Sequence, residues 1–214
     1  MAADVDLEKQ AAASAAACLV EGGMTVGLGT GSTVAYLLPA IAARGLDIRC
    51  VATSHATESD ARRLGLDVRP FEGIDRLDLA IDGADQVTPG NWLIKGGGGA
   101  HTREKVVAAA AERFVVIVSS DKPVERLSPP VPLELMGFGA DSILRSLPQA
   151  KLRPSTPRTP DGGLIADWYG EFDDPAALSA LLEATPGVVG HGLFSPELVS
   201  EVFIGRKDGV EHRR

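Results

Sequence analysis

The stretch MTVGLGTGSTVAYLLPAIAA, residues 24–43, predicts a strand, a glycine-rich loop and a helix in direct succession. Residues 24–28 are a short apolar strand, and residues 29–33 (GTGST) are the loop. Residues 34–43 carry apolar side chains on every side of a helical wheel, which is typical of a buried helix. This segment therefore favours an α/β fold, in which helices cover a sheet.

The same alternation continues on both sides of this stretch. We expect helices at residues 8–21, 58–64 and 101–113, and apolar strands at residues 48–52, 77–81 and 114–118. Gly22 and Gly23 are expected to end the first helix, because glycine is common at helix C-termini. Continuously apolar strands that alternate with helices indicate a mostly parallel sheet covered on both faces. Residues 1–127 are thus predicted to form one doubly wound unit.

A composition shift at residues 128–132 (SPPVP) marks the predicted domain boundary, because these prolines cannot continue a helix or a central strand. The segments that follow are predicted as strand 133–136, helix 141–147, strand 151–153, strand 164–168, helix 175–184 and strand 188–193. This β-α-β-β-α-β order is the ferredoxin-like pattern. A last apolar strand, 198–204, is expected to rejoin the first sheet. The prediction is a larger domain of residues 1–127 plus 198–214 and a smaller α+β domain of residues 128–197.

Composition and charge limit the partners. The chain has 214 residues and a formal net charge of -8, without a run of basic residues, so nucleic acid is not expected as a partner, whereas a single phosphate is possible. Cys18 and Cys50 are both predicted to be buried thiols. The acidic N-terminus does not resemble a signal peptide, and the apolar run 11–20 is too short to cross a bilayer. We expect a cytoplasmic protein with no membrane partner.

The loop of residues 29–33 predicts a phosphate site. Glycine amides converge there at the start of a helix, and the hydroxyls of Thr30, Ser32 and Thr33 add donors beside Gly31. The alternative is a tight turn with Ser32 as the helix N-cap. A dinucleotide is not indicated, because the spacing is not GxGxxG and Thr53 stands where the partner acid is required.

Two carboxylates follow the apolar strand 77–81 in the sequence Asp82-Gly83-Ala84-Asp85. The carboxyl ends of parallel strands are where open α/β sheets place their sites. Asp82 and Asp85 could divide proton-transfer roles if their environments separate their pKa values. The alternatives are a metal site or a plain Asp-Gly turn.

Lys95 opens a run of four glycines that leads into a helix. A lysine beside the amides of Gly96, Gly97 and Gly98 is a good receptor for a developing oxyanion, although a flexible linker is the default explanation for such a run. Glu104, in the first helical turn, is either a general base or a carboxylate that interacts with the helix dipole.

Lys122 follows the strand 114–118 and could supply a second cation for phosphate, or be a solvated lysine. The four histidines have no metal-ligand spacing, and no metal residue is assigned.

Taken together, these motifs resemble the type A ribose-5-phosphate isomerases. The resemblance rests on the following segments in order: residues 29–33, Thr53-Ser54, residues 81–85 (IDGAD), residues 95–99 (KGGGG), Arg103-Glu104-Lys105, residues 186–189, residues 192–194, Ile204-Gly205 and residues 208–210. It implies a Rossmann-like main domain with a ferredoxin-like second domain, and no metal or organic cofactor. It also implies a homodimer, with a tetramer as the alternative, and isomerisation of D-ribose 5-phosphate and D-ribulose 5-phosphate through an enediol in the pentose phosphate pathway.

The resemblance also implies a role for each residue. Glu104 would move a proton between C2 and C1, and Lys95 would stabilise the enediolate oxygen. Asp82 would assist ring opening and proton exchange at oxygen, with Asp85 nearby. The substrate oxygens, chiefly those of phosphate, would be held by Thr30, Gly31, Ser32, Thr33 and Lys122.

Three positions depart from the family pattern: Gln86, the pair His101-Thr102, and Asp121 beside Lys122. A carboxylate next to a phosphate-binding lysine weakens binding if it faces the ligand, so we expect a raised KM or a substrate other than ribose 5-phosphate. Two alternative functions stay open: a sugar-phosphate sensor without catalysis, and an isomerase of another phosphorylated pentose.

Overall fold

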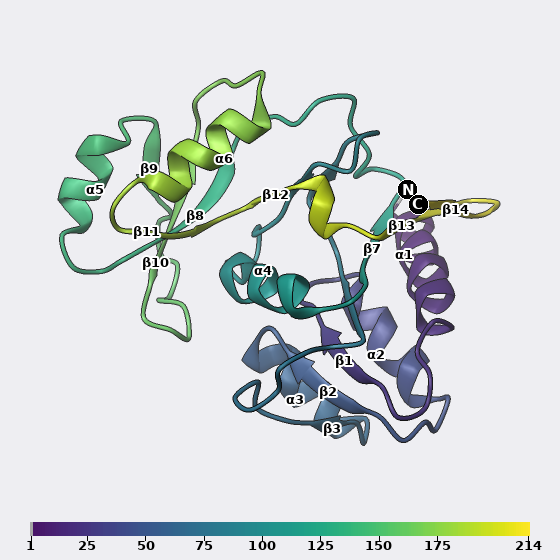
Figure 1. Ribbon diagram of the computed structural model, residues 1–214. Helices are drawn as coiled ribbons and strands as arrows, with labels where there is room; N and C mark the ends of the chain where they lie inside the picture. The colour runs from purple at the N-terminus through teal and green to yellow at the C-terminus, as the bar shows by residue number, and fades with distance from the viewer. Residues whose placement is uncertain (1) are drawn as a thin grey trace. The chain divides into compact units, whose positions relative to one another are not determined.

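The computed structural model describes residues 2–214 and contains two compact units (Figure 1). The first unit holds the chain up to Ala84, together with Arg103–Pro123 and Glu197–Arg214. The second unit holds Asp85–Thr102 and Val124–Pro196.

The first unit is built on a seven-stranded sheet in the order β14-β13-β7-β4-β1-β2-β3. Its strands are β1 (Thr25–Leu28), β2 (Arg49–Ala52), β3 (Asp67–Val68), β4 (Leu79–Asp82), β7 (Phe114–Ser119), β13 (Glu201–Arg206) and β14 (Gly209–Arg213). All neighbouring strands are parallel except the β13–β14 hairpin. The chain runs outward from β1 to β3 and then returns to β4 on the other side of β1. The sheet therefore reverses its strand order between β1 and β4, which is where open α/β sheets bind ligands.

Helices cover both faces of this sheet, as the sequence predicts. The helices α1 (Ala2–Ala17), α2 (Val34–Ala42) and α3 (His55–Arg63) share one apolar core with side chains such as Val26 and Leu28 of β1. Side chains alternate along a strand, so Gly27 faces the opposite side, where α4 (His101–Ala110) lies. A Cβ at Gly27 would lie 2.5 Å from Val107 of α4, so glycine is required for this helix to pack closely.

The first helix differs from its prediction. It spans Ala2–Ala17, whereas residues 8–21 were expected, and it ends before Gly22 because residues 18–20 continue only as turns. Cys18 consequently lies beyond the helix and is exposed, so its prediction as a buried thiol is wrong. Cys50 is buried in β2 as expected, and this burial, with the nearby charge of Asp67, raises the pKa of its thiol to about 12.

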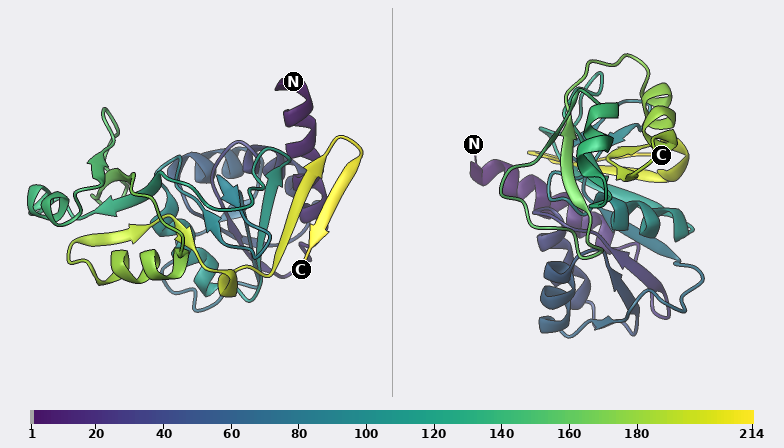
Figure 2. Two further views of the ribbon diagram at one scale, coloured as in Figure 1. Left: turned by 90° about the horizontal axis from the view of Figure 1, so that it is seen from above. Right: turned by 90° about the vertical axis from the view of Figure 1, so that its left-hand side faces the viewer.

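The predicted last strand rejoins the first sheet. It lies at β13, parallel to β7, and β14 adds an antiparallel strand at the edge (Figure 2). The hairpin of β13 and β14 lies beside α1 in the same unit. The sequence did not predict β14.

The second unit contains the β-α-β-β-α-β segment. Its antiparallel sheet has the order β11-β8-β10-β9, and two helices cover one face. The elements are β8 (Val131–Leu135), α5 (Ala140–Ser146), β9 (Ala150–Leu152), β10 (Leu164–Trp168), α6 (Pro175–Ala184) and β11 (Val188–His191). This connectivity confirms the ferredoxin-like pattern. Ile143 of α5 and Leu178 and Leu182 of α6 pack on Leu133 and Leu135 of β8.

Pro132 corrects one detail of the boundary. It lies inside β8, a strand with neighbours on both sides, although the prolines were expected to exclude a central strand. The register explains why proline is tolerated: Pro132 is opposite Asp167 of β10, but the pairing of β8 with β11 extends only from Leu133 to Leu135.

A small three-stranded sheet in the second unit has the order β12-β6-β5. Its strands are β5 (Gln86–Val87), β6 (Leu93–Ile94) and β12 (Leu193–Phe194). Because β5 and β6 pair with β12, residues 85–102 group with the second unit, whereas the sequence predicts that they belong to the larger domain. No helix among the described residues is long and apolar enough to cross a membrane.

Candidate active site

Asp82 lies at the carboxyl end of β4, in the first unit, and is 3% exposed. Its Oδ1 accepts hydrogen bonds from the backbone N–H of Thr30 at 3.0 Å and of Gly83 at 2.7 Å. A Cβ at Gly29 would lie 2.0 Å from the carboxyl carbon of Asp82, so only glycine fits there. The loop of residues 29–33 and the Asp82 carboxylate are therefore held together at the point where the strand order reverses.

Threonine hydroxyls fix the other side of this loop. Thr30 Oγ1 lies 2.8 Å from Thr53 Oγ1 and 3.2 Å from Thr57 Oγ1, and Thr57 donates to the Gly29 carbonyl. The Thr30 side chain thus shapes the loop from within. Thr57 was not among the predicted site residues, since a threonine inside a helix gives no signal in a single sequence.

The start of α2 leaves donors available. Its N-cap is Thr33 in a helical conformation, and no side chain caps the helix, so the alternative reading of Ser32 as the N-cap is wrong. Gly31 has a φ of +120°, which favours glycine, and both Gly31 and Ser32 are exposed. The exposed amides and hydroxyl at a helix N-terminus suit an anion.

Lys122 has a carboxylate partner. Its Nζ lies 3.2 Å from Asp121 Oδ2, and Asp121 also accepts a hydrogen bond from Ser119. Burial opposes ionisation of Asp121, but the bonds from Ser119 and Lys122 and the lysine charge outweigh it and lower the pKa of this carboxyl. Asp121 is therefore ionised and partly neutralises Lys122.

Glu104 lies in the first turn of α4 and is 6% exposed. A helix N-terminus favours negative charge, so this position suits a carboxylate that is removed from bulk water.

Lys95 directly follows β6 in the second unit and is 2% exposed. Its backbone N–H donates to the Gly192 carbonyl at 2.8 Å, and its Nζ lies 5.5 Å from the centroid of the Phe194 ring. A Cβ at Gly192 would lie 2.1 Å from the Lys95 carbonyl oxygen, so the strand can approach only because this residue is glycine. These contacts fix the ammonium in a water-poor environment, where its charge acts strongly.

The glycine run forms a tight turn rather than a flexible linker. The Gly99 N–H donates to the Gly96 carbonyl at 2.9 Å, and both residues have positive φ, +76° and +109°. The Gly97 N–H donates to Asp85 Oδ2 at 2.8 Å. Asp85 is exposed, so its surroundings differ from those of the buried Asp82. Within residues 2–214 no three His, Cys, Asp or Glu side chains gather as a metal site.

Comparison with known proteins identifies the family. The family model described as ribose 5-phosphate isomerase A (phosphoriboisomerase A) matches residues 49–209. A ribose-5-phosphate isomerase A from Caulobacter vibrioides is 45% identical, over 96% of each chain. This chain belongs to the ribose 5-phosphate isomerase A family. The resemblance stated from the motifs is confirmed.

Solved structures of ribose 5-phosphate isomerases share the fold over nearly the whole chain. The enzyme from Methanocaldococcus jannaschii superposes with a TM-score of 0.91 and 32% identity, covering 97% of this chain and 98% of that one. A D-ribose-5-phosphate isomerase in complex with phospho-erythronic acid gives a TM-score of 0.92 and 33% identity, covering 98% and 99%. The predicted fold class is thereby confirmed.

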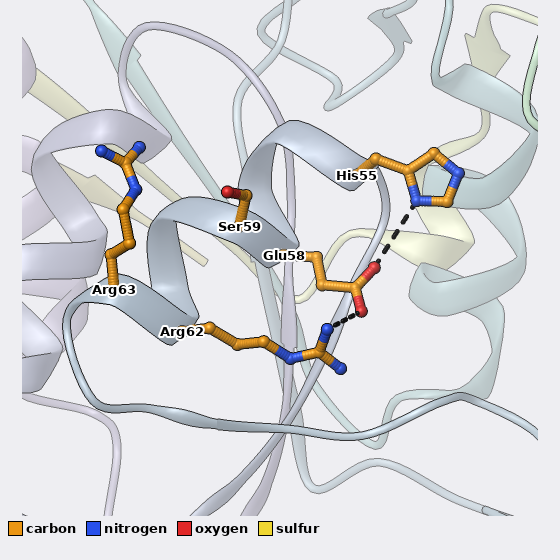
Figure 3. Close-up of a pocket in the computed structure, with 5 residues that line it drawn as sticks. All are labelled: His55, Glu58, Ser59, Arg62 and Arg63. Atoms are coloured by element: carbon orange, nitrogen blue, oxygen red, sulfur yellow. Dashed lines mark ion pairs between the residues drawn. The ribbon is translucent and has the colours of Figure 1, made fainter.

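A shallow hollow lies on α3 in the first unit. His55, Glu58, Ser59, Arg62 and Arg63 line it (Figure 3). Glu58 pairs with Arg62 at 2.6 Å and lies 3.6 Å from His55, and Arg63 pairs with Asp60. Because acidic partners neutralise both arginines, the hollow does not favour a phosphate.

Proposed function

We propose that Glu104 and Lys95 carry out the reaction of the family in this chain, the interconversion of D-ribose 5-phosphate and D-ribulose 5-phosphate. Glu104 takes the proton from C2 of the open-chain aldose. The electron pair of that C–H bond forms the C1=C2 double bond, and the carbonyl electrons move to O1. Glu104 then returns a proton to C1 and the ketone forms at C2.

The observation that carries this proposal is the buried ammonium of Lys95 beside an ordered turn of glycine amides. Negative charge on O1 is the main obstacle to proton removal next to a carbonyl. A fixed cation and oriented N–H groups stabilise such charge without reorganising in the reaction. A general base alone contributes roughly 10²- to 10⁴-fold, so the remaining rate enhancement depends on these groups.

Asp82 is proposed to open the sugar ring and to move the proton between O2 and O1, with Asp85 assisting. Its burial supports this role, because a carboxylate held away from bulk water by fixed N–H donors keeps one position from which it can transfer a proton to and from the sugar oxygens. In addition, Asp85 accepts a hydrogen bond from the Gly97 N–H, which positions the Asp85 carboxylate.

The phosphate is proposed to bind at the start of α2, held by Gly31, Ser32 and Thr33, with Thr30 and Lys122. The uncapped helix start supports this assignment. Binding the phosphate away from the reacting carbons supplies energy that can position the sugar.

Steady-state kinetics of wild type and Glu104→Gln test the base assignment. We expect kcat for ribose 5-phosphate to fall at least about 100-fold, because the amide cannot accept the C2 proton. Glu112→Gln is the matched control, since Glu112 is exposed and pairs with Arg76. If Glu104→Gln retained wild-type kcat, Glu104 would not be the base. A wild type that binds the sugar without converting it would favour the sensor function.

A homodimer formed through the second unit is proposed. Exposed apolar side chains support this, above all Phe138, which is 88% exposed, with Met136 and Val189. Apolar side chains at a protein surface often mark an interface, and a symmetric dimer is the commonest assembly.

The cytoplasm is proposed as the compartment. Cys18 and Cys50 are both free thiols, which suits a reducing environment. Recovery of the enzyme in the membrane or secreted fraction would contradict this.

A further inference from the structure

Arg153, which directly follows β9, bridges the glycine turn and the sheet of the second unit. Its Nη1 donates to the carbonyl of Gly97 at 2.9 Å and reaches that of Gly96 at 3.4 Å. On its other edge, Nε and Nη2 donate to the two carboxylate oxygens of Asp167 at 2.9 and 2.6 Å. Neither Arg153 nor Asp167 has a role in the reaction proposed above.

Asp167 makes this bridge rigid. It lies in β10 on the face of the sheet that carries no helices, and its side chain is nearly buried. A bidentate arginine–carboxylate pair fixes the plane of the guanidinium. The same pair raises the pKa of Arg153, so the guanidinium keeps its charge.

The direction of the Gly98 amide follows from these contacts. In a trans peptide the C=O and the next N–H point to opposite sides. When Arg153 holds the Gly96 carbonyl, the Gly97 N–H points away from it, and this N–H is taken by Asp85. When Arg153 holds the Gly97 carbonyl, the Gly98 N–H likewise points away from it.

The Gly98 N–H is a donor that the protein itself does not use. Gly98 is exposed, a Cβ there would meet no atom within 4 Å, and no acceptor for its N–H occurs among residues 2–214 that the structure describes. Consecutive glycines have unusual conformational freedom, so this orientation would be lost without an anchor. Arg153 is an anchor on the carbonyl side of the turn.

We propose that Arg153 is a positioning residue for the isomerisation, which holds the Gly96 and Gly97 carbonyls so that the Gly98 N–H is directed at the oxygen that becomes negative in the enediolate. The proposal rests on the function proposed above. Because this oxygen gains its charge during the reaction, the contribution of Arg153 belongs to the transition state more than to substrate binding.

Kinetics of Arg153→Ala and Arg158→Ala test this role. Arg158 is the matched control, because it lies on the same connection and donates to the carbonyl of Gly162, outside the proposed site. For Arg153→Ala we expect kcat to fall about 10- to 100-fold while KM changes less than about threefold. Removing one oxyanion donor lowers kcat roughly 10²- to 10³-fold. The expected loss is smaller here because the Gly98 N–H is still present and only loses its fixed direction. Arg158→Ala should match wild type.

Rescue experiments separate positioning from a general structural role. Guanidinium ion at millimolar concentration should restore part of kcat in Arg153→Ala, but not raise kcat of wild type or Arg158→Ala. Arg153→Lys should be intermediate, because one ammonium keeps the charge but not the planar fork that bonds Asp167 and the turn together.

Arg153→Ala leaves Asp167 without its ion partner, so folding is checked by circular dichroism. If that variant is unfolded at the assay temperature, the double variant Arg153→Ala/Asp167→Asn is used as the test, because it removes both charges of the ion pair. We expect the same loss of kcat in the double variant. Wild-type kcat in a folded variant, or a rise in KM alone, would overturn the proposal. A wild type that does not isomerise ribose 5-phosphate would instead contradict the proposed function.

Discussion

At the scale of single residues, the carboxylate of Asp121 is paired with the cation that is proposed to bind phosphate, Lys122. Asp121 lies 3.2 Å from the Lys122 ammonium, so a phosphate that approaches Lys122 competes with a carboxylate that is already in place. The pair is partly exposed, and exposed pairs contribute only about 0.2–1 kcal/mol. The effect on substrate binding is therefore expected to be modest.

Asp121→Ser should lower KM for ribose 5-phosphate about two- to fivefold and leave kcat unchanged, because the competing charge is removed. Asp173→Ser is the control, since Asp173 pairs with Arg126 in the second unit. An unchanged KM in Asp121→Ser would mean that Lys122 does not bind the phosphate or that Asp121 does not oppose it.

Gly29→Ala should reduce kcat at least about 10-fold and lower the melting temperature. The added Cβ would overlap the Asp82 carboxyl and displace it from the N–H groups of Thr30 and Gly83. Gly22→Ala is the matched control, because a Cβ there meets nothing within 4 Å. Equal kcat and melting temperature in the two variants would contradict the account of this loop.

At the scale of elements, Glu201 ties the terminal hairpin to the sheet. Glu201 is a nearly buried residue of β13. Its Oε1 pairs with Arg113, and its Oε2 lies 2.7 Å from Nε2 of His212 in β14. Burial opposes its ionisation, but the bonds and charges of Arg113 and His212 outweigh burial and lower the pKa of Glu201. A depressed carboxyl pKa stabilises the fold above the ordinary pKa, and this contribution is lost as pH falls through the folded value.

We therefore expect the free energy of unfolding to fall as the pH drops below the ordinary glutamate value of about 4.3. Glu201→Gln should lose about 1–2 kcal/mol at pH 7 and show a weaker acid dependence, as measured by urea denaturation between pH 3 and pH 7. An unchanged acid dependence in this variant would show that other carboxyls cause it.

Sequence patterns predicted the elements with clear flanking signals better than the elements without them. Strand β10 and helix α6 occur at the predicted bounds, since each has an apolar pattern and clear flanking signals: Asp174 caps α6, and Pro175 occupies its first turn. The two-residue strands β5 and β6 are too short to show any period. The first helix was misplaced because its Ala-rich sequence has no sharp signal at either end.

The sequence predicted only those candidate residues that stand in local motifs. Asp82, Lys95 and Glu104 stand in recognisable local patterns, whereas the bond of Arg153 to Asp167 depends on the register of β9 with β10, where Asp167 lies opposite Lys151. Register is a tertiary property that alternating patterns restrict but do not fix across a long connection. The contacts of the Thr30 hydroxyl with those of Thr53 and Thr57 could not be predicted either, because they join residues that are far apart in the sequence.

At the scale of the whole molecule, the proposed dimer predicts that a variant with a disrupted interface has a lower mass in solution than wild type. Phe138→Asp should convert the dimer to a monomer in light scattering after size exclusion, because a charge replaces an apolar side chain at the proposed interface. Leu7→Asp, on α1 of the first unit, is the control, since Leu7 is also exposed. A wild type that is already monomeric, or a Phe138→Asp variant that stays dimeric, would contradict the proposed interface.

Proton NMR of D-ribose 5-phosphate in D₂O with EDTA, followed over time with wild type and Glu104→Gln, tests whether this chain is an isomerase with Glu104 as its base. We expect wild type to form ribulose 5-phosphate that carries deuterium at C1, because a carboxylate base exchanges its proton with solvent, and Glu104→Gln to form almost none. Isomerisation by both proteins at similar rates, or sugar bound by wild type but unchanged, would contradict it.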